Sequence, residues 1–350
     1  MTEIDSDKLL ARYDRQMRFA PIGTDGQNKL RNASVLIVGL GALGSTSAET
    51  LARAGVGFLR IVDRDFLELN NLQRQSLYTE ADVASGLPKA IAAADRLRQI
   101  NSSIIIEPIV ADVSSANITS LCDSIQLIVD GTDNFETRFL INDVAIARGL
   151  PWVYGGCLGC DGQTMTIVPG QSACLRCLMP EGPPNASELP TCDTAGVLAP
   201  IINVIASIQS LEALKILSGN PTAICDKLQV FSLWDNRVRQ IGVGQLRKSS
   251  NCLACIQKDF EWLDGRRGSQ PVVLCGRNAV QLRFPGSDEF DLPGIAERLR
   301  GLFPVQLNRF LLKFSVESFE LTLFPDGRAI ISGTQDPVVA RRLYAQYFGN

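Results

Sequence analysis

Two pairs of cysteines are the residues in this chain whose spacing most clearly suggests chemistry. Cys174 and Cys177 form one Cys-x-x-Cys pair, and Cys252 and Cys255 form a second pair far along the chain. Four thiolates in two such pairs are the ligand set of a closed, tetrahedral zinc site. A redox role for one pair is the alternative. We favour a structural Zn²⁺ ion that ties the two segments together.

The chain of 350 residues contains no histidine. Acid–base catalysis by imidazole and nucleophiles activated by histidine are therefore excluded. Chemistry must rest on Asp, Glu, Lys, Arg, Cys, backbone groups or a metal. An oxidoreductase with a histidine proton donor is excluded on the same ground.

A glycine loop follows the first apolar run of the chain. Gly39, Gly41 and Gly44 have the Gly-x-Gly-x-x-Gly spacing, and Ala42 begins a helical pattern. Such a loop brings phosphate groups close to the backbone N–H groups of a helix N-terminus. Asp63 ends the next apolar run, about 20 residues on, where an acid binds ribose hydroxyls. The pattern predicts a nucleotide site, with a tight turn without ligand as the alternative, and leaves open whether the nucleotide is a dinucleotide or ATP.

The elements that must position these residues alternate between strand and helix. Strands are expected at 34–39, 58–63, 104–110, 126–131, 152–157 and 163–168, and a closing hairpin at 227–234 and 237–243. Helical patterns run from the glycine loop to about residue 54 and over 87–100, 135–148 and 197–217. This alternation predicts an α/β fold with a Rossmann-like, doubly wound mixed sheet.

The character of the chain changes after the last of the four cysteines. We expect one domain at 1–265, with the nucleotide site in 34–150, the zinc site in 174–255 and a long surface loop at about 179–200. Residues 266–350 then form a small α+β accessory domain. Its strand-like runs are 280–284, 309–314, 320–324 and 329–332, and its helical runs are 294–302 and 337–348.

Composition narrows the possible partners and the location. The net charge of −3, with 20% charged and 45% hydrophobic residues, argues against a nucleic-acid partner. There is no run of 18 apolar residues and no signal-peptide pattern, so we expect no membrane partner. A cytoplasmic protein is expected, in which the ten cysteines are reduced.

Four further strings carry a resemblance to a known family. They are Arg12–Gln16, Asn71-Leu72-Gln73-Arg74-Gln75 followed by Lys89, Asp130-Gly131-Thr132-Asp133-Asn134, and the run from Thr191 through Cys192 to Val197. Together with the glycine loop, they resemble the ThiF/MoeB branch of the ubiquitin-activating enzyme superfamily over roughly residues 10–260. Several motifs in the family's order are far more specific than any one of them.

The resemblance implies a reaction and its partners. A relative of this kind uses ATP and Mg²⁺ to adenylate the C-terminal Gly-Gly carboxylate of a ubiquitin-like sulfur-carrier protein, which is later converted to a thiocarboxylate. It also implies a homodimer. Residues 270–350 do not match a rhodanese domain, because Cys275 lacks the expected arginine-bounded loop. A separate sulfur donor, such as a cysteine desulfurase or a rhodanese, is therefore expected.

The resemblance also assigns roles to residues. Arg74, Lys89 and Asn71 would contact phosphate, Asp133 would hold Mg²⁺, and Arg15 would reach the neighbouring subunit's ATP. Cations suit this chemistry because both reactants are anions. Cys192 would form a covalent thioester or persulfide-type link with the activated carrier, or be a bystander loop cysteine. The nucleotide-binding set comprises Gly39, Gly41, Ala42, Gly44, Asp63, Asn71, Arg74, Gln75, Lys89, Asp133 and Asn134.

The remaining cysteines and three alternative functions complete the expectations. Cys157 and Cys160 are assigned to core packing, and Cys122, Cys225 and Cys275 to buried fillers. An NAD(P)- or flavin-dependent oxidoreductase would use the same glycine loop. A non-catalytic subunit of an activating heterodimer would bind a partner only. Adenylation of a small peptide C-terminus in antibiotic biosynthesis is an alternative within the enzyme class.

Overall fold

The structure, a computed structural model, describes residues 10–182, 195–249, 251–267, 272–274, 278–282, 290–325 and 327–348. The chain divides into two compact units, one up to residue 268 and one from residue 269 on. Cys192 and Cys275 lie outside the described residues.

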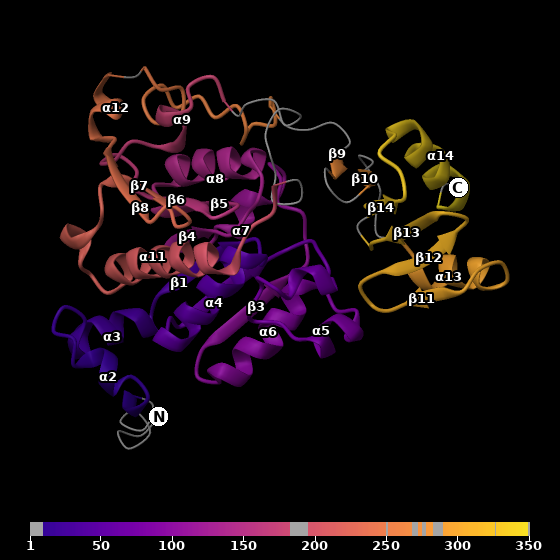
Figure 1. The fold of residues 1–350 in the computed structure, drawn as a ribbon, viewed down its shortest axis with the longest axis horizontal. Coiled ribbons are helices and arrows are strands. Elements are labelled where there is room, and N and C mark those ends of the chain that lie inside the picture. Colours follow the sequence, from indigo (N-terminus) through magenta and orange to yellow (C-terminus); the bar gives the residue numbers. More distant parts are fainter. Residues whose placement is uncertain are drawn as a thin grey trace. The chain divides into compact units, whose positions relative to one another are not determined.

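The first unit is built on an eight-stranded mixed sheet with the order β3-β2-β1-β4-β5-β6-β7-β8 (Figure 1). Strands β1 to β5 run parallel in this sheet, and β6, β7 and β8 pair antiparallel. The strands are β1 Ser34–Val38, β2 Phe58–Val62, β3 Ile105–Ile109, β4 Leu127–Asp130, β5 Trp152–Leu158, β6 Asp161–Ile167, β7 Lys227–Ser232 and β8 Arg237–Gly242. The predicted Rossmann-like mixed sheet is confirmed.

Helices cover both faces of this sheet (Figure 1). On one face lie α4 (Ala42–Ala54), α6 (Lys89–Ile100) and α11 (Ala199–Leu217), and on the other lie α7 (Ile118–Leu121) and α8 (Phe135–Arg148). Strand β1 shows why two layers form: Val35 and Ile37 pack into one buried cluster, and Leu36 and Val38 into the other. Successive side chains of a strand point to opposite faces, so an all-apolar strand needs cover on both sides.

Shorter helices complete the unit. They are α2 Asp14–Met17, α3 Gly23–Arg31, η1 Leu69–Asn71, α5 Glu80–Ser85, α9 Leu175–Leu178, η2 Pro221–Ala223 and α12 Gly244–Ser249. The sequence analysis did not predict α2, α3, α5 or α12. The buried residues of α3 are Gly26, Gln27 and Leu30, so this helix shows no apolar period along its sequence.

Helix α11 is long and apolar enough, by length and composition, to cross a membrane. Half of its most apolar window is buried inside the protein. It packs against α4 and the sheet strands β5 and β6, and Gln209 and Glu212 on it are buried and hydrogen-bonded. These contacts are those of a core helix.

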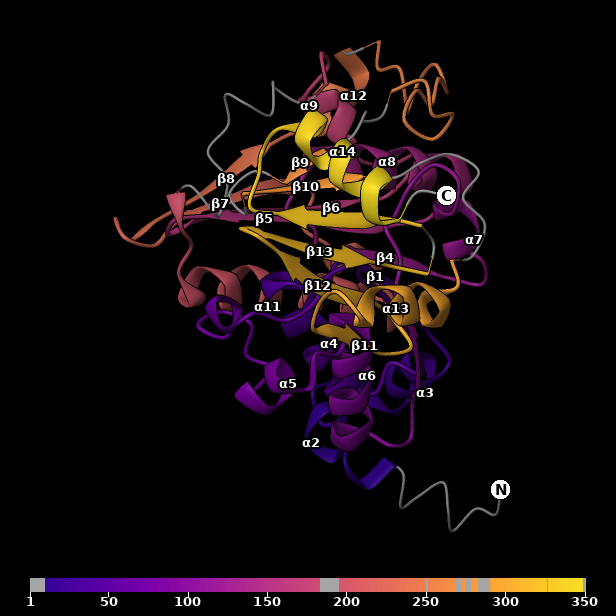
Figure 2. The same ribbon diagram turned by 90° about the vertical axis from the view of Figure 1, so that its right-hand side faces the viewer.

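The second unit is a six-stranded antiparallel sheet with the order β11-β12-β13-β14-β10-β9. Its elements are β9 Val272–Leu274, β10 Ala279–Leu282, α13 Leu292–Arg300, β11 Val305–Leu307, β12 Leu312–Val316, β13 Phe319–Leu323, β14 Ala329–Ser332 and α14 Pro337–Tyr347. Both helices lie on one face of this sheet (Figure 2), where Phe314, Leu321 and Tyr344 are buried in one apolar cluster. The α+β character is as predicted, but the strand expected at 309–314 is β12, at Leu312–Val316.

Candidate nucleotide site and cysteine centre

The glycine loop between β1 and α4 is packed backbone to backbone against the end of β4. Gly39 has a φ of +86°, in the left-handed region that favours glycine. A Cβ atom on Gly44 would lie 1.8 Å from the carbonyl oxygen of Gly39, and one on Gly131 would lie 2.4 Å from the same oxygen. Side chains are therefore excluded at these three positions by the protein itself.

The Leu40 peptide within this loop is held from both sides. Its N–H donates to Oδ2 of Asp63 at 2.6 Å, and its carbonyl accepts from the Tyr78 hydroxyl at 2.9 Å. Asp63 keeps some exposed surface, but its other oxygen accepts from the Asp65 N–H at 2.7 Å. Burial raises the pKa of Asp63, an effect that the positive charge of Lys89 opposes. Burial also raises the pKa of Tyr78, which keeps that hydroxyl protonated as a donor.

Gly41 differs from the other two loop glycines. Among the described residues, the only atom within 4 Å of a Cβ built there is Nε2 of Gln75, at 3.9 Å. Helix α4 starts one residue later and has no side-chain cap. No described residue therefore covers the N-terminal end of α4 beside Gly41, and phosphate binding at a helix N-terminus requires such an opening. Gln75 is 3% exposed and lies at this opening.

Asn71 and Arg74 are placed by the short helix η1. Asn71 is buried and closes a capping box with Glu68, whose N–H donates to Oδ1 of Asn71 at 3.1 Å. The Arg74 guanidinium donates to the Asn70 carbonyl at 2.8 Å and is partly exposed. The structure thus gives Asn71 a structural hydrogen bond, and its predicted phosphate contact stays a prediction.

Lys89 is the first residue of α6 and is 4% exposed. Its backbone N–H donates to the Asp65 carbonyl at 2.8 Å. Its ammonium lies 3.6 Å from Oδ2 of Asp65. A buried lysine with this ion pair is a positive charge fixed at the carboxyl ends of the strands, where it also acts on Asp63.

Asp133 is exposed on the turn after β4, and a buried ion pair shapes that turn. Asp130 is fully buried, and Oδ2 accepts from Nε of Arg138 at 3.1 Å. Its other oxygen accepts from the N–H and the hydroxyl of Thr132. Asn134 caps α8 by accepting from the Thr137 N–H at 2.8 Å. Asn134 therefore has a helix-capping role, and its predicted contact with nucleotide stays a prediction.

Arg15 lies exposed on α2. The neighbouring Tyr13 docks this segment: its ring is buried against Gly55, and its hydroxyl accepts from Asn101 Nδ2 at 2.8 Å. The helix is thus held against the core while Arg15 faces away from it. This orientation is compatible with a contact in trans, which stays a prediction.

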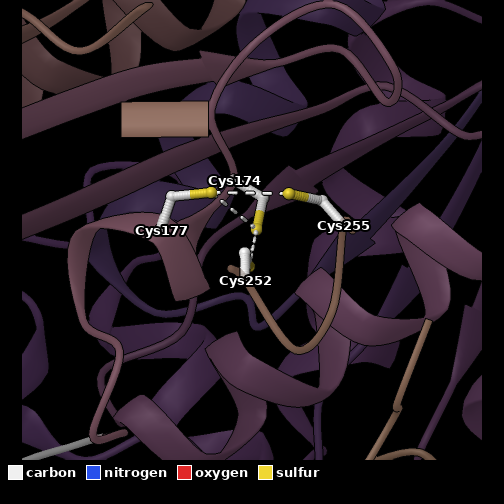
Figure 3. Close-up of side chains that lie close together, drawn as sticks. All are labelled: Cys174, Cys177, Cys252 and Cys255. Carbon is white, nitrogen blue, oxygen red and sulfur yellow. Dashed lines mark hydrogen bonds between the residues drawn. The ribbon is translucent and has the colours of Figure 1, made fainter. Parts of the chain in front are cut away.

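The four predicted zinc ligands converge on one point (Figure 3). The sulfur atoms lie within 4.8 Å of one another, and all four residues are buried. Three separations are 3.8 Å for Cys174–Cys177, 3.6 Å for Cys174–Cys252 and 3.4 Å for Cys177–Cys255. A tetrahedral Zn²⁺ with Zn–S bonds of about 2.3 Å separates its sulfurs by about 3.8 Å. The donor set and its size therefore fit zinc.

Hydrogen bonding within the cluster already favours thiolate at two of its members. The Cys174 thiol lowers the pKa of Cys177, and it lowers the pKa of Cys252 to about 7. The pKa values of Cys174 and Cys255 are raised in the same cluster, so these two members favour the thiol form. Metal binding requires the thiolate form of all four and would release their protons.

Helix α8 supports the segments that carry these cysteines. Asn142 accepts from the Leu175 N–H at 2.9 Å, and Asp143 accepts from the Trp262 N–H at 3.0 Å. Arg176, between two of the cysteines, donates to Glu261 at 2.8 Å. Burial raises the pKa of Asp143 to about 6. These contacts connect both halves of the cysteine centre to the main sheet.

The other described cysteines lie apart from this centre. Cys122 is buried, and burial raises its pKa to about 11. Cys157 is partly exposed, and its thiol donates to the Ile201 carbonyl on α11 at 3.9 Å. Cys160 is partly exposed at the β5–β6 turn. Cys225 is also partly exposed, which corrects its assignment as a buried filler.

Two residues of the candidate nucleotide site, Tyr78 and Arg64, were not predicted from the sequence. Tyr78 was missed because its role depends on a hydrogen bond to a loop distant in sequence. Arg64 lies between Asp63 and Asp65 and points its guanidinium toward Asp112, 3.0 Å away. The sequence signal that could have indicated Arg64 is its position between two acidic residues at the end of a predicted strand.

Comparison with solved structures places the fold in a known class. The crystal structure of Escherichia coli MccB with succinimide has a TM-score of 0.60 and 22% identity, covering 70% of this chain and 74% of that chain. At this identity the likeness concerns the fold alone. The ThiF family model matches residues 13–254, and this chain belongs to the ThiF family.

Two relatives share extended similarity. The chain is 44% identical over 344 residues to the sulfur carrier protein ThiS adenylyltransferase of Bacillus subtilis, covering 97% of this chain and all of that protein. It is 38% identical over 256 residues to the adenylyltransferase and sulfurtransferase MOCS3 of Culex quinquefasciatus, covering 73% of this chain and 57% of that protein. The resemblance drawn from the motifs is confirmed.

Proposed function

We propose that this chain is an ATP-dependent adenylyltransferase that activates the C-terminal Gly-Gly carboxylate of a ubiquitin-like sulfur-carrier protein. The observation that carries the proposal is its similarity, over 97% of its length, to a relative named as a ThiS adenylyltransferase. The glycine loop, Asp63 and the buried Lys89 supply a nucleotide site at the sheet edge that suits this reaction.

The proposed reaction is an in-line displacement. A carboxylate oxygen of the carrier attacks the α-phosphorus of ATP, the bond from that phosphorus to the bridging oxygen breaks, and pyrophosphate leaves with its electron pair. Lys89, Arg74 and the N–H groups of α4 bind phosphate and offset the accumulated negative charge. Asp63 accepts hydrogen bonds from the ribose. Mg²⁺ would be held by Asp133 and would offset the negative charge of the phosphates.

Exchange of radioactive pyrophosphate into ATP, with a panel of carriers ending in Gly-Gly, tests this function. We expect exchange with at least one carrier and none with a carrier lacking the terminal glycine. An Asp133→Ala variant should lose most exchange. Exchange by that variant at the wild-type rate would contradict the role of Asp133, and no exchange with any carrier would contradict the function.

The alternatives are less well supported. An NAD(P)- or flavin-dependent oxidoreductase leaves Arg74, Lys89 and Asp133 without a role, and the relatives are named as adenylyltransferases. Adenylation of a small peptide rests on a fold-level likeness to MccB alone. Adding a peptide substrate to the same exchange assay distinguishes adenylation of a carrier protein from adenylation of a peptide.

Covalent participation of Cys192, a homodimer with Arg15 acting in trans, and a separate sulfur donor belong to the proposal. Cys192 lies outside the described residues. Intact mass spectrometry of wild type and Cys192→Ser, each with carrier and ATP, tests the first point. An adduct on wild type alone supports it, and normal sulfuration of the carrier by the variant contradicts it.

A bound zinc ion and a cytoplasmic location complete the proposal. The cysteine cluster fits zinc in its donors and in its dimensions. Thiolate ligands persist in a reducing compartment. One zinc per chain is expected in the purified protein.

A further inference from the structure

One arginine, Arg64, lies within the electrostatic influence of four carboxylates at the carboxyl ends of the strands. Asp63 and Asp65 follow β2, Asp112 follows β3, and Asp133 follows β4. The Arg64 guanidinium lies 3.0 Å from Oδ1 of Asp112 and 3.7 Å from Oδ1 of Asp65. Burial acts to lower the pKa of Arg64, but the negative charges of these carboxylates outweigh it and raise that pKa.

Asp65 is shared between two cations. Its Oδ1 faces Arg64, and its Oδ2 faces the Lys89 ammonium at 3.6 Å. Lys89 is nearly inaccessible, whereas the Arg64 side chain is 25% exposed. The same carboxylate therefore places Lys89 and competes with phosphate for it. The less the charge of Asp65 is neutralised, the more strongly Asp65 attracts the Lys89 ammonium.

The net charge of Arg64, Lys89 and the four carboxylates also affects the binding of an anionic nucleotide. Four carboxylates with Arg64 and Lys89 sum to −2 (four negative charges plus two positive), and without Arg64 the sum is −3. Without the Arg64 charge, this site therefore repels an anionic nucleotide more strongly.

We propose that Arg64 is a positioning residue that acts through Asp65. By neutralising one side of that carboxylate, it leaves the ammonium of Lys89 free to bind the phosphates of ATP. The inference rests on the proposed function only in taking Lys89 as a phosphate ligand.

Arg64→Met removes the charge and keeps much of the aliphatic volume. We expect the Kd for ATP with Mg²⁺, measured by calorimetry, to rise about tenfold. In pyrophosphate exchange the KM for ATP should rise by a similar factor, with kcat within about twofold of wild type, because ground-state and transition-state binding are lost together. Arg64→Lys should restore most of the affinity, and equal melting temperatures would show that the fold is intact.

Two further variants separate this role from a purely structural one. Asp112→Asn breaks the shorter ion pair of Arg64 without changing Asp65, so the Kd for ATP should stay within about threefold of wild type. Adding Asp65→Asn to Arg64→Met removes the competing charge while keeping the backbone carbonyl that holds Lys89. The Kd of this double variant should return toward wild type.

Contrary results would overturn the inference. If Asp112→Asn weakens ATP binding as much as Arg64→Met does, Arg64 merely fastens β2 to the segment after β3. If the double variant binds ATP no better than Arg64→Met, the effect does not pass through Asp65. Wild-type protein that binds no ATP would overturn it as well. ATP binding with the expected pattern, but without exchange on any carrier, would defeat the proposed function and leave this inference standing.

Discussion

The three glycines of the glycine loop have different roles in the structure, although the sequence does not distinguish them. At Gly44 a methyl group would collide with the Gly39 carbonyl at 1.8 Å, whereas at Gly41 the nearest atom of the described residues is 3.9 Å away. The protein itself therefore requires Gly44. Gly41 leaves open space that a bound phosphate would fill.

This difference predicts opposite outcomes for a matched pair of variants. Gly41→Ala should fold with a free energy of unfolding within about 1 kcal/mol of wild type but bind ATP at least about tenfold more weakly, because its methyl occupies the phosphate approach. Gly44→Ala should lose about 3 kcal/mol of stability from overpacking. Urea unfolding and ATP calorimetry on both measure this. Tight ATP binding by Gly41→Ala would place the phosphates elsewhere.

Asp143 gives a prediction about pH. Burial raises its pKa from 3.8 to about 6 in the folded protein, so the native state binds more protons than the unfolded state between these values. Its contribution to stability is present at low pH and is lost as pH rises through 6. Asp143→Asn keeps an acceptor for the Trp262 N–H but does not ionise.

The stability of Asp143→Asn relative to wild type should therefore rise by about 2–3 kcal/mol between pH 4 and pH 7. Urea unfolding of both proteins across this range checks it. Loss of zinc at low pH affects both proteins and cancels in the difference. A difference that does not vary with pH would show that Asp143 titrates as an ordinary carboxyl.

At the scale of elements, the cysteine centre joins the short helix α9 to a segment that carries little secondary structure of its own. Residues 251–267 contain no described helix or strand. They are held by the cysteines, by Asp143 and by the stacking of Trp262 on Phe139, whose ring centroids lie 5.5 Å apart. A metal that binds both segments supplies the order that a helix or strand would otherwise give.

Removing zinc should therefore unfold this part of the chain before the sheet. A strong chelator, or Cys252→Ser, should lower the melting temperature by at least about 10 °C. Cys122→Ser, at a buried cysteine outside the centre, is the control and should keep one zinc per chain. Elemental analysis with thermal unfolding measures both properties. A zinc-free protein with unchanged melting would show that the cluster is not a structural metal site.

Sequence patterns predicted elements well where one face or both faces had to be apolar. Strands β1, β2, β4 and β5 were found within one or two residues of their expected positions, because each is a short, mainly apolar run with at least three buried residues. Short edge strands such as β11, with three residues, are too short to show an alternation of apolar and polar residues from which a strand could be predicted. Site residues that act through distant hydrogen bonds, such as Tyr78, could not be predicted because spacing along the chain carries no information about them.

For the whole molecule, the proposed contact of Arg15 with the site of a second subunit has the clearest test. Arg15→Ala and Asp133→Ala should each be nearly inactive, since each disables both sites of a homodimer. Co-expressed in equal amounts, half of the dimers pair one variant with the other, and each such dimer has one intact site of two. About a quarter of wild-type exchange activity should return.

Size-exclusion chromatography with light scattering, run on the same samples, establishes that dimers are present. Two Asp133→Ala subunits paired together serve as the control and should recover nothing. Failure of the mixed dimers to exceed either parent, with dimers present, would show that Arg15 serves the site of its own chain or none.

The contact among Gly39, Gly44 and Gly131 has a consequence for how the site evolves and can be redesigned. It joins the glycine loop, which we propose to bind phosphate, to the turn that carries Asp133 through main-chain atoms alone. No exchange of side chains can shift one of these parts against the other by a small step. The spacing between the bound phosphates and the proposed metal ligand is therefore inherited as a unit. Changes of substrate must come from the residues around this unit rather than from within it.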